Sequence, residues 1–408
     1  MSKQLIVIGG GASGFFCAIN VAMQNQSLQI TIIEKQKNVL QKVKVSGGGR
    51  CNVTHACFQN SKLVTFYPRG KNFLKKTFSL FSTKDTVQWF ANQGVQLHTE
   101  ADGRMFPTSN HSDSIIQCFL NLTSQYRIAL KTNTEIISIE KNGFSYILKD
   151  KNGYPYTADF VMIATGGYHK DSQYQWLQKL GHTFIHPVPS LFTFNLAHSS
   201  INTLMGVSVE NILVKIAGTK FSEQGPLLIT HWGFSGPAIL RLSAWAARTL
   251  HEMNYHFSIQ INWINQEEHQ VRLHWNTIRE KQAGLLISNK NPFQIPQRLW
   301  HFILTEANID FNTKWSELTS KAQNKLIHRL TAQAFEVKGK TTFKEEFVTC
   351  GGIPLNEVDP QTMQSKLAKN IYFGGEILDV DGITGGFNFQ HAWSCGMIAS
   401  RSIVNHSI

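Results

Sequence analysis

The alternation of apolar and polar positions at the start of the chain predicts a strand, a helix and a second strand. Gln4–Ile8 and Gln29–Ile33 are short, mostly apolar runs of the length and β-branched character typical of buried parallel strands. Ser13–Asn25, which lies between them, has the length and spacing of a helix. This order predicts a βαβ unit of the Rossmann type at the beginning of the chain.

Further along, the pattern changes character twice. Up to about residue 189 it predicts a helix, a strand pair joined at Asn142-Gly143 and another buried strand: Ser112–Ser124, Thr134–Glu140 with Phe144–Lys149, and Phe160–Ala164. The next part predicts antiparallel strands and then helices: Phe192–Leu196, Val207–Ile216, Leu227–Ile229, Ala238–Leu250, and mainly helices from Gln266 to Ala334. A short strand, Asn370–Phe373, and a final helix, His391–Val404, return to the first pattern.

The first turn carries glycines in G-x-G-x-x-G spacing, at Gly9, Gly11 and Gly14. The first allows a tight turn, the second lets a pyrophosphate approach the backbone, and the third lets helix and strand pack closely. Glu34 ends the second strand, where a carboxylate can accept hydrogen bonds from ribose hydroxyls, and this favours FAD or NAD over NADP. The predicted nucleotide-binding residues here are Gly9, Gly11, Ala12, Ser13, Gly14, Glu34 and Lys35.

A second glycine-rich stretch, Ser46–Thr54, follows directly. Its three consecutive glycines expose backbone N–H groups to a flat or anionic ligand. The next three residues add a cation (Arg50), a thiol (Cys51) and an amide (Asn52). Two later strands are also followed by glycine-bearing turns, at Ala164-Thr165-Gly166 and at Gly374–Gln390. In the second of these, a helix N-terminus after Gly385 can present its N–H groups to the pyrimidine edge of a flavin. The predicted cofactor-binding residues in these stretches are Ser46, Gly47, Gly48, Arg50, Cys51, Asn52, Ala164, Thr165, Gly166, Gly375, Glu376, Gly385, Gly386, Phe387 and Asn388.

Composition narrows the class of protein. With 408 residues and 42% apolar content, the chain can bury a large core. Six scattered cysteines and 16 histidines show no metal-ligand spacing, so no metal site is predicted. Leu5–Met23 is uncharged and resembles a signal peptide, but its glycines are explained by the strand–turn–helix interpretation, and we expect a cytoplasmic protein without a membrane span.

The net charge of +12 is concentrated in one stretch. Lys35–Lys84 contains no Asp or Glu, but eleven Lys and Arg residues with six aromatic residues between them. Two phosphates of FAD do not account for so many cations. Phosphate contacts combined with base stacking need this composition, so we expect a polyanionic partner, most consistent with RNA. The alternative is a solvated basic face, and Phe73, Phe78 and Phe81 are expected to be core residues.

Five motifs together resemble the YhiN/BaiN-type flavoproteins, also described as aminoacetone-oxidase-like or NAD(P)/FAD-dependent oxidoreductases: Gly9–Gly14, Ser46–Thr54, Gly103–Pro107, Thr230–Ala238 and Gly374–Gln390. The resemblance implies a glutathione-reductase-like α/β fold, in which an FAD-binding Rossmann domain (residues 1–189 and 346–408) is split by an inserted β-barrel-like plus helical domain (residues 190–345). It also implies that Ile136 meets the adenine through its backbone and that six residues surround the isoalloxazine: Arg50, Cys51, Asn52, Gly385, Gly386 and Asn388. The electron donor stays open, with NAD(P)H as the transient candidate; only one complete dinucleotide fingerprint is present, so no dedicated nicotinamide site is expected.

The resemblance leaves the substrate open among amines, conjugated C=C bonds of steroids and, in the YhiN branch, uracil of ribosomal RNA. The basic stretch adjoins the flavin loop, which favours reduction of uracil to dihydrouridine, with hydride delivered to C6 and a proton from Cys51 or His231 delivered to C5. The second hypothesis is a small-molecule flavin oxidase or enone reductase. The third is a non-catalytic RNA-binding flavoprotein.

Overall fold

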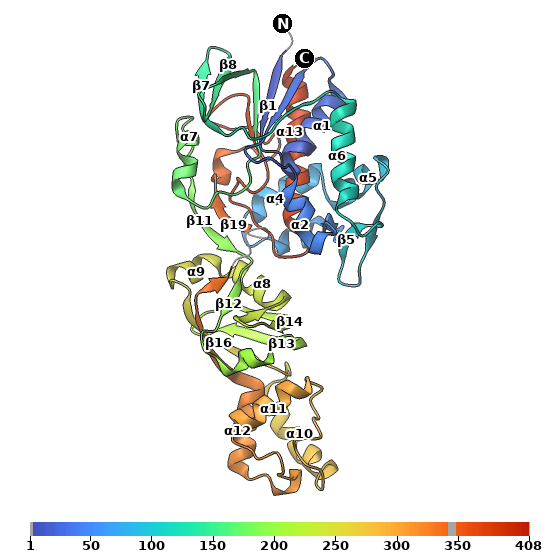
Figure 1. Cartoon of the computed structure of the whole chain (residues 1–408), viewed down its shortest axis with the longest axis vertical. Helices are drawn as coiled ribbons and strands as arrows, with labels where there is room; N and C mark the ends of the chain where they lie inside the picture. The colour runs from blue at the N-terminus through green and yellow to red at the C-terminus, as the bar shows by residue number, and fades with distance from the viewer. Residues whose placement is uncertain (1–2, 342–347, 408) are drawn as a thin grey trace. The chain divides into compact units, whose positions relative to one another are not determined.

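The computed structural model describes residues 3–341 and 348–407 and divides the chain into two compact units. Unit 1 comprises Met1–Ser190 and Phe343–Ile408, and unit 2 comprises Leu191–Thr342. The sequence pattern places the first boundary between residues 189 and 190, and its second boundary, at residue 345, lies outside the described residues. Figure 1 shows the chain coloured by residue number, with the final, red helix in the same unit as the first, blue elements.

Unit 1 is built on a five-stranded parallel sheet with the order β20-β10-β1-β2-β6. β1 (Gln4–Ile8) is the middle strand, so both of its edges are paired: Leu5 lies opposite Phe160 on one side and Ile30 on the other. Residues 5–8 of this strand are buried. The other strands are β2 (Gln29–Ile33), β6 (Ala129–Lys131), β10 (Phe160–Ile163) and β20 (Ile371–Phe373). The predicted Rossmann-type fold is therefore confirmed.

Two helices, α1 (Ala12–Gln24) and α13 (Phe387–Ser407), run side by side along this sheet (Figure 1). Their close approach depends on Gly396, where an added Cβ would lie 2.8 Å from the carbonyl oxygen of Ser13. α13 begins at Phe387, four residues before the predicted start at His391, because the left-handed backbone of Gly385 (φ 131°) and Gly386 (φ 89°) ends immediately before it. The first helical turn thus falls inside the predicted flavin loop.

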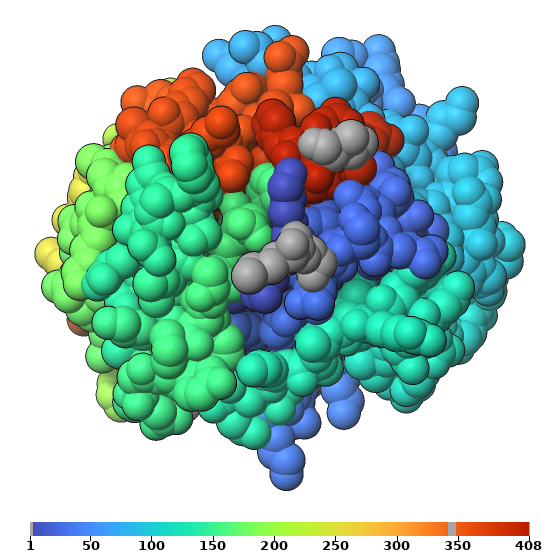
Figure 2. Space-filling model, turned by 90° about the horizontal axis from the view of Figure 1, so that it is seen from above, coloured from blue at the N-terminus to red at the C-terminus, as the bar shows by residue number. Residues whose placement is uncertain are grey.

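Smaller elements complete unit 1. Three short sheets are formed by β3 (Thr54–His55), β5 (Arg104–Pro107) and β4 (Leu97–Thr99); by β7 (Ile136–Asn142), β8 (Ser145–Asp150) and β9 (Pro155–Ala158); and by β11 (Ile185–Ser190) with β19 (Val348–Gly352). The helices include α2 (Gln41–Gly49), α3 (Asn60–Leu63), α4 (Lys71–Leu80), α5 (Thr83–Asn92) and α6 (Asp113–Gln125). The start of β1 and the end of α13 reach the surface together (Figure 2), where Lys3 Nζ donates to the carbonyl oxygen of Ser407 at 2.9 Å.

Unit 2 contains a seven-stranded sheet, β17-β16-β13-β14-β15-β12-β18, whose neighbouring strands all pair antiparallel. Its strands are β12 (Thr193–Asn195), β13 (Ser208–Ile216), β14 (Ser222–Ile229), β15 (Gly233–Ser235), β16 (His256–Asn262), β17 (Gln333–Lys338) and β18 (Lys340–Thr341). Within this unit, α10 (Glu268–Lys281), α11 (Gln297–Glu306) and α12 (Ser320–Ala332) form a helical group around buried Trp275, Trp300 and Trp315.

One helix predicted in unit 2 is divided in the structure. Ala238–Leu250 is not a single helix but two, α8 (Pro237–Trp245) and α9 (Ala247–Glu252). They meet at Ala246, whose backbone (φ −93°, ψ 7°) is not helical. The apolar spacing continues across this break, so the sequence carries no glycine or proline signal for it.

Candidate functional site

The first glycine turn contains two glycines that packing requires. Gly9 has φ 111°, and a Cβ there would lie 2.2 Å from the carbonyl oxygen of Ala164. A Cβ on Gly14 would lie 2.1 Å from the carbonyl oxygen of Gly9. These positions therefore hold β1, β10 and α1 together whether or not a ligand is present.

Gly11 is different, because a Cβ added there would meet no protein atom within 4 Å. Its backbone is extended and directly precedes Ala12, the first residue of α1. In the same turn the Oγ of Ser13 is buried and has no hydrogen-bond partner. Open space, an unsatisfied hydroxyl and a helix N-terminus at one place fit a pyrophosphate group.

Glu34 lies beside this turn, where its Oε2 accepts a hydrogen bond from the N–H of Gly10 at 2.7 Å. The N–H of Thr134 donates to the carbonyl oxygen of Glu34 at 2.9 Å, which keeps the start of β7, and with it the buried Ile136, next to the end of β2. Lys35 places its Nζ 5.8 Å from the centre of the Tyr168 ring. The structure thus brings together the residues predicted to hold the ADP half of FAD.

The second glycine stretch interrupts helix α2. Ser46 (ψ 149°), Gly47 (φ 58°) and Gly48 (φ 70°) leave the helical conformation, and a Cβ on Gly47 would lie 2.8 Å from the Phe106 ring. Arg50 stacks its guanidinium on that same ring at 4.0 Å and pairs with Glu100 at 2.6 Å. The loop is therefore held in place by β5 and its turn, while the space at Gly48 is free of protein atoms within 4 Å.

Hydrogen bonds join this loop to the glycines before α13. With its amide oriented to satisfy both neighbours, Asn52 accepts from the N–H of Gly386 at 2.9 Å and donates to the carbonyl oxygen of Thr54 at 3.0 Å. Thr54 Oγ1 also donates to Gln390 Oε1 at 2.6 Å. Asn388 holds Gly382 through its backbone N–H (2.8 Å) and carbonyl (2.9 Å). The two predicted flavin loops therefore form one structure.

A third group surrounds the end of β10. Ala164 directly follows that strand, and Thr165 and Gly166 (φ 74°) come next. Following Gly375 (φ 77°), Glu376 accepts from the N–H of Thr349 at 2.7 Å and pairs with Lys42 at 2.6 Å. The buried Oγ1 of Thr349 has no partner, so this group too offers an unsatisfied hydroxyl to a polar ligand. Its chemistry fits the ribityl chain or phosphates of FAD.

The two candidate proton donors lie in different units. Cys51 belongs to unit 1, is fully buried and adopts a left-handed backbone (φ 61°). Burial raises the pKa of its thiol to about 12, so the thiol keeps its proton at neutral pH. His231 is exposed in unit 2, with its ring 4.4 Å from that of Trp232, and is not among the residues gathered in unit 1.

The sequence interpretation missed His55. Its ring stacks on Phe387 at 4.8 Å and also faces Phe66 at 5.8 Å, so it lies where the two flavin loops meet. Its Nε2 lies 3.1 Å from the carbonyl oxygen of Asp102, and its buried Nδ1 has no partner. Burial lowers the pKa of His55, which favours the neutral ring. Its only signal in the sequence is that it directly follows the loop.

The structure partly corrects the expectation that the cations of the basic stretch Lys35–Lys84 are available to a polyanion. Arg69 is not available to a polyanion, because it forms an ion pair with the fully buried Asp381. Lys42 and Arg50 pair with Glu376 and Glu100. The remaining eight cations are exposed: Lys35, Lys37, Lys44, Lys62, Lys71, Lys75, Lys76 and Lys84. The expectation that Phe73, Phe78 and Phe81 are core residues is confirmed, since all three are buried.

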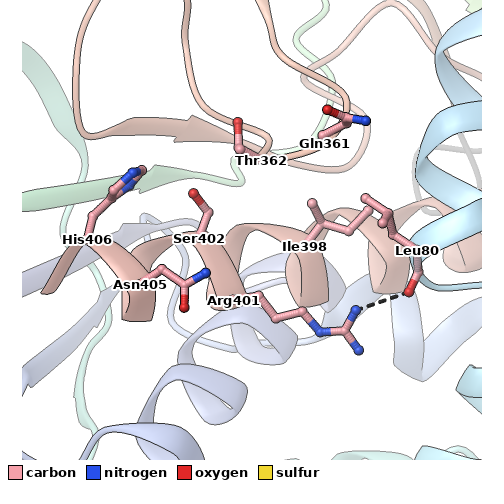
Figure 3. Close-up of a pocket in the computed structure, with 8 residues that line it drawn as sticks. All are labelled: Leu80, Gln361, Thr362, Ile398, Arg401, Ser402, Asn405 and His406. Atoms are coloured by element: carbon pink, nitrogen blue, oxygen red, sulfur yellow. Dashed lines mark hydrogen bonds between the residues drawn. The ribbon is translucent and has the colours of Figure 1, made fainter. Parts of the chain in front are cut away.

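A shallow pocket of about 210 Å³ lies elsewhere, against the C-terminal half of α13 (Figure 3). Arg401 crosses its floor and donates to the carbonyl oxygen of Leu80 at 3.0 Å. Ile398 in its wall is roughly 17 Å along the helix from Phe387, at about 1.5 Å per residue. This pocket is therefore not the site formed by the glycine loops.

The structure also bears on metal binding and on membrane insertion. Among residues 3–341 and 348–407, no group of His, Cys, Asp or Glu side chains is arranged to hold a metal ion. Over the same residues, no helix has both the length and the apolar composition needed to cross a bilayer.

Comparison with known proteins now assigns the family. Residues 3–402 match the family described as the HI0933-like protein Rossmann domain. The chain belongs to this family. Its fold and its family make it an FAD-dependent oxidoreductase.

Curated relatives in this family carry two different names. The chain is 26% identical over 409 residues to the 3-dehydro-bile acid delta(4,6)-reductase of Clostridium scindens, covering 98% of both proteins. It is also 26% identical over 409 residues to the ribosomal RNA dihydrouridine synthase of Escherichia coli, covering 98% of this chain and 97% of the relative. Among solved structures, the 3-ketosteroid delta1-dehydrogenase of Sterolibacterium denitrificans has the same fold, with a TM-score of 0.53, 11% identity and coverage of 99% and 100%.

Proposed function

We propose that this protein reduces the C5=C6 bond of a uracil in ribosomal RNA to dihydrouridine. The observation that carries the proposal is the set of eight exposed lysines in an acid-free stretch that begins at the end of β2 and surrounds the flavin loop in sequence. Such a surface attracts a polyanion to the site and disfavours a small cationic amine. A relative named for the same reaction, at 26% identity, supports it.

The chemistry divides between cofactor and protein. Bound FAD in its reduced form would supply a hydride to C6 of the base, and NAD(P)H is the reductant we propose for reloading it. The protein's contribution is to hold the flavin edge and to deliver a proton to C5. The N-terminus of α13 and the cation of Arg50 would stabilise negative charge on the flavin.

Proton delivery is assigned to Cys51 or His231. Cys51 keeps its proton at neutral pH because burial raises its pKa to about 12, and it lies in the loop that Asn52 fixes to Gly386. A donor with so high a pKa must act in concert with hydride arrival, when the basicity of C5 rises. His231 is the alternative, since its exposed ring can exchange protons with water directly.

The second candidate function is reduction of a conjugated C=C bond in a small molecule. The relative named as a bile-acid reductase is as similar to this chain as the dihydrouridine synthases are. Both reactions add hydride and proton across an activated double bond, so the loops of unit 1 serve either. The feature that favours RNA over a small molecule is the set of eight exposed lysines before and after the loop in the sequence.

Mapping dihydrouridine in ribosomal RNA tests the proposal. Cells lacking the gene should lose dihydrouridine at a defined position, and complementation with the wild-type gene should restore it. Complementation with Gly11→Val, which is designed to exclude FAD, should not. A ribosomal RNA with unchanged dihydrouridine content in the deletion strain would reject the RNA substrate and leave the enone reductase.

A further inference from the structure

An exposed aromatic ring, Phe58, lies next to the flavin loop. Its side chain is 55% exposed, whereas Tyr67, Phe73, Phe78 and Phe81 of the same basic stretch are all buried. Phe58 follows β3 by three residues, so its Cα lies at most about 14 Å from that of Thr54 even if the chain between them were fully extended. A large apolar ring is therefore kept at the surface within reach of the loop that is bonded to α13.

The backbone around Phe58 is well fixed on both sides. Before it, the N–H of Ala56 donates to the carbonyl oxygen of Gly103 at 2.7 Å. After it, Asn60 opens α3 and its Nδ2 donates to the carbonyl oxygen of Phe78 at 2.7 Å, at the end of α4. Leu63, in the same short helix, is fully buried. The ring thus projects from a rigid base, and little ordering is needed when a flat ligand stacks on it.

The cation nearest to this ring in the sequence is Lys62. Lys62 lies four residues after Phe58, in the last turn of α3, and its side chain is exposed. Burial raises the pKa of Cys57, and the ammonium of Lys62 opposes that rise. Burial lowers the pKa of His55, Asp102 opposes this through its carbonyl and its charge, and the ammonium of Lys62 adds to the lowering. Lys62 is therefore within electrostatic range of His55, the last residue of β3, and of Cys57, two residues after it.

We propose that Phe58 stacks on an unpaired nucleotide next to the target base, with Lys62 contacting its phosphate. The inference rests on the proposed RNA substrate and adds to it: the target uracil would lie in a single-stranded segment. A ring face recognises any base, and a cation recognises the backbone, so this pair selects unpaired strand rather than sequence. A base inside a duplex cannot present its face to a side chain.

The chain offers a matched control for the ring. Phe144 is 99% exposed in unit 1, but it follows the Asn142-Gly143 turn of the β7–β8 hairpin, a different sheet from the one that contains β3. Phe58→Ala and Phe144→Ala each remove one exposed aromatic ring of the same kind. Both variants should retain FAD, because neither ring is part of the core.

Binding of a short single-stranded oligouridylate and of a double-stranded RNA of equal length is measured for each variant. Phe58→Ala should weaken single-strand binding by about 5- to 150-fold, the equivalent of one base stack, and should leave duplex binding unchanged. Phe58→Trp should bind within a few-fold of wild type. Lys62→Gln should lower the log–log salt slope for the single strand by about 0.7.

The outcomes separate this inference from the proposed function. Wild-type protein that binds the oligouridylate while Phe58→Ala and Phe144→Ala bind it equally well would overturn the stacking role and leave the RNA substrate standing. Wild-type protein that binds neither RNA would overturn the proposed function and this inference with it. An equal loss of duplex and single-strand affinity in Phe58→Ala would also overturn the selection of unpaired strand.

Discussion

At the scale of single residues, the glycines of the first turn have different tasks, although their spacing makes them look alike. Gly9 and Gly14 meet backbone oxygens at 2.2 and 2.1 Å when a Cβ is added, so they belong to the packing of the fold. Gly11 meets nothing. The spacing in the sequence predicts the turn, but only coordinates separate the glycine that leaves room for a ligand from those that leave room for the protein.

This difference gives the first prediction. Gly11→Val should abolish retention of FAD while the apoprotein keeps its melting temperature, because the side chain enters space that only the pyrophosphate would occupy. Gly14→Ala should instead destabilise the apoprotein itself. Gly284→Val, at an equally open glycine of unit 2, serves as the control and should keep its flavin. Full flavin content in Gly11→Val would show that the pyrophosphate does not pass this turn.

The second prediction divides the role of proton donor between Cys51 and His231. Alanine at the true donor should lower the rate of substrate reduction by about 10²–10⁴-fold while the rate of flavin reduction stays unchanged. Alanine at the other position should remain within a few-fold of wild type. Stopped-flow measurement of both half-reactions gives the two rates separately. If both variants react at the wild-type rate, neither residue supplies the proton, and His55 becomes the next residue to test.

A buried histidine in α13 gives a prediction about pH. Burial lowers the pKa of His391 to about 4, while its Nε2 lies 3.3 Å from the carbonyl oxygen of Gly375. In the unfolded chain this imidazole takes up a proton near pH 6.5, whereas in the folded protein it stays neutral until the pH approaches 4. The contribution of the neutral ring to the free energy of unfolding is therefore complete above pH 6.5 and is lost as the pH falls towards 4. Between pH 7 and pH 5 the loss should be about 2 kcal/mol.

His391→Gln keeps a donor for Gly375 but does not titrate, so its free energy of unfolding should fall about 2 kcal/mol less than wild type over this interval. Urea unfolding of the two apoproteins at both pH values measures the difference. The histidines at positions 55, 169 and 182, whose pKa values are also lowered, are present in both proteins and do not affect the comparison. Identical pH dependence would show that His391 is not a buried neutral group.

At the scale of elements, the apolar pattern predicted the bounds of two strands of the parallel sheet, but it did not predict which distant loops would contact each other. Gln4–Ile8 and Gln29–Ile33 are strands with the predicted bounds, because buried parallel strands need continuous apolar runs. The sequence did not show that Arg69 would be buried with Asp381, more than 300 residues away. An ion pair between distant segments leaves no local pattern, so Arg69 was wrongly counted among the cations available to a polyanion.

Helix α4 carries the element-scale prediction for RNA. Lys71, Lys75 and Lys76 are exposed on this helix, while Phe73 and Phe78 anchor its other face in the core. Replacing the three lysines by Gln should weaken RNA binding equally for all sequences. The log–log salt slope should fall by roughly 0.7–0.9 for each phosphate that the variant no longer neutralises. Flavin content should not change.

The matched control for α4 lies on the β7–β8 hairpin and the turn after it, where Lys141, Lys149 and Lys151 are also exposed. Their triple replacement by Gln changes the net charge equally and should leave the salt slope close to wild type. Filter-binding titrations at several salt concentrations compare the two triple variants. Equal slopes would mean that net charge, rather than α4, attracts RNA, and would remove these three lysines from the footprint.

At the scale of the whole molecule, the sequence was sufficient for the family and the fold but not for every part of the site. Motifs with fixed spacing, such as Gly9–Gly14 and Ser46–Thr54, predicted the Rossmann-type unit and the glycine loops, because each motif must satisfy a local backbone requirement. His55 and the unsatisfied hydroxyls of Ser13 and Thr349 could not be predicted, since they are defined only by what surrounds them in space. The early start of α13 was missed because loop and helix share the same apolar residues.

The most direct test of the account is a single turnover of the purified, FAD-loaded protein. The flavin is reduced without oxygen, and the protein is then mixed either with ribosomal RNA lacking modifications or with a steroid enone. We predict that the RNA reoxidises the flavin and gains one dihydrouridine for each flavin oxidised, whereas the enone reacts much more slowly. Rapid reoxidation by the enone, with RNA that leaves the flavin reduced and gains no dihydrouridine, would contradict the RNA substrate.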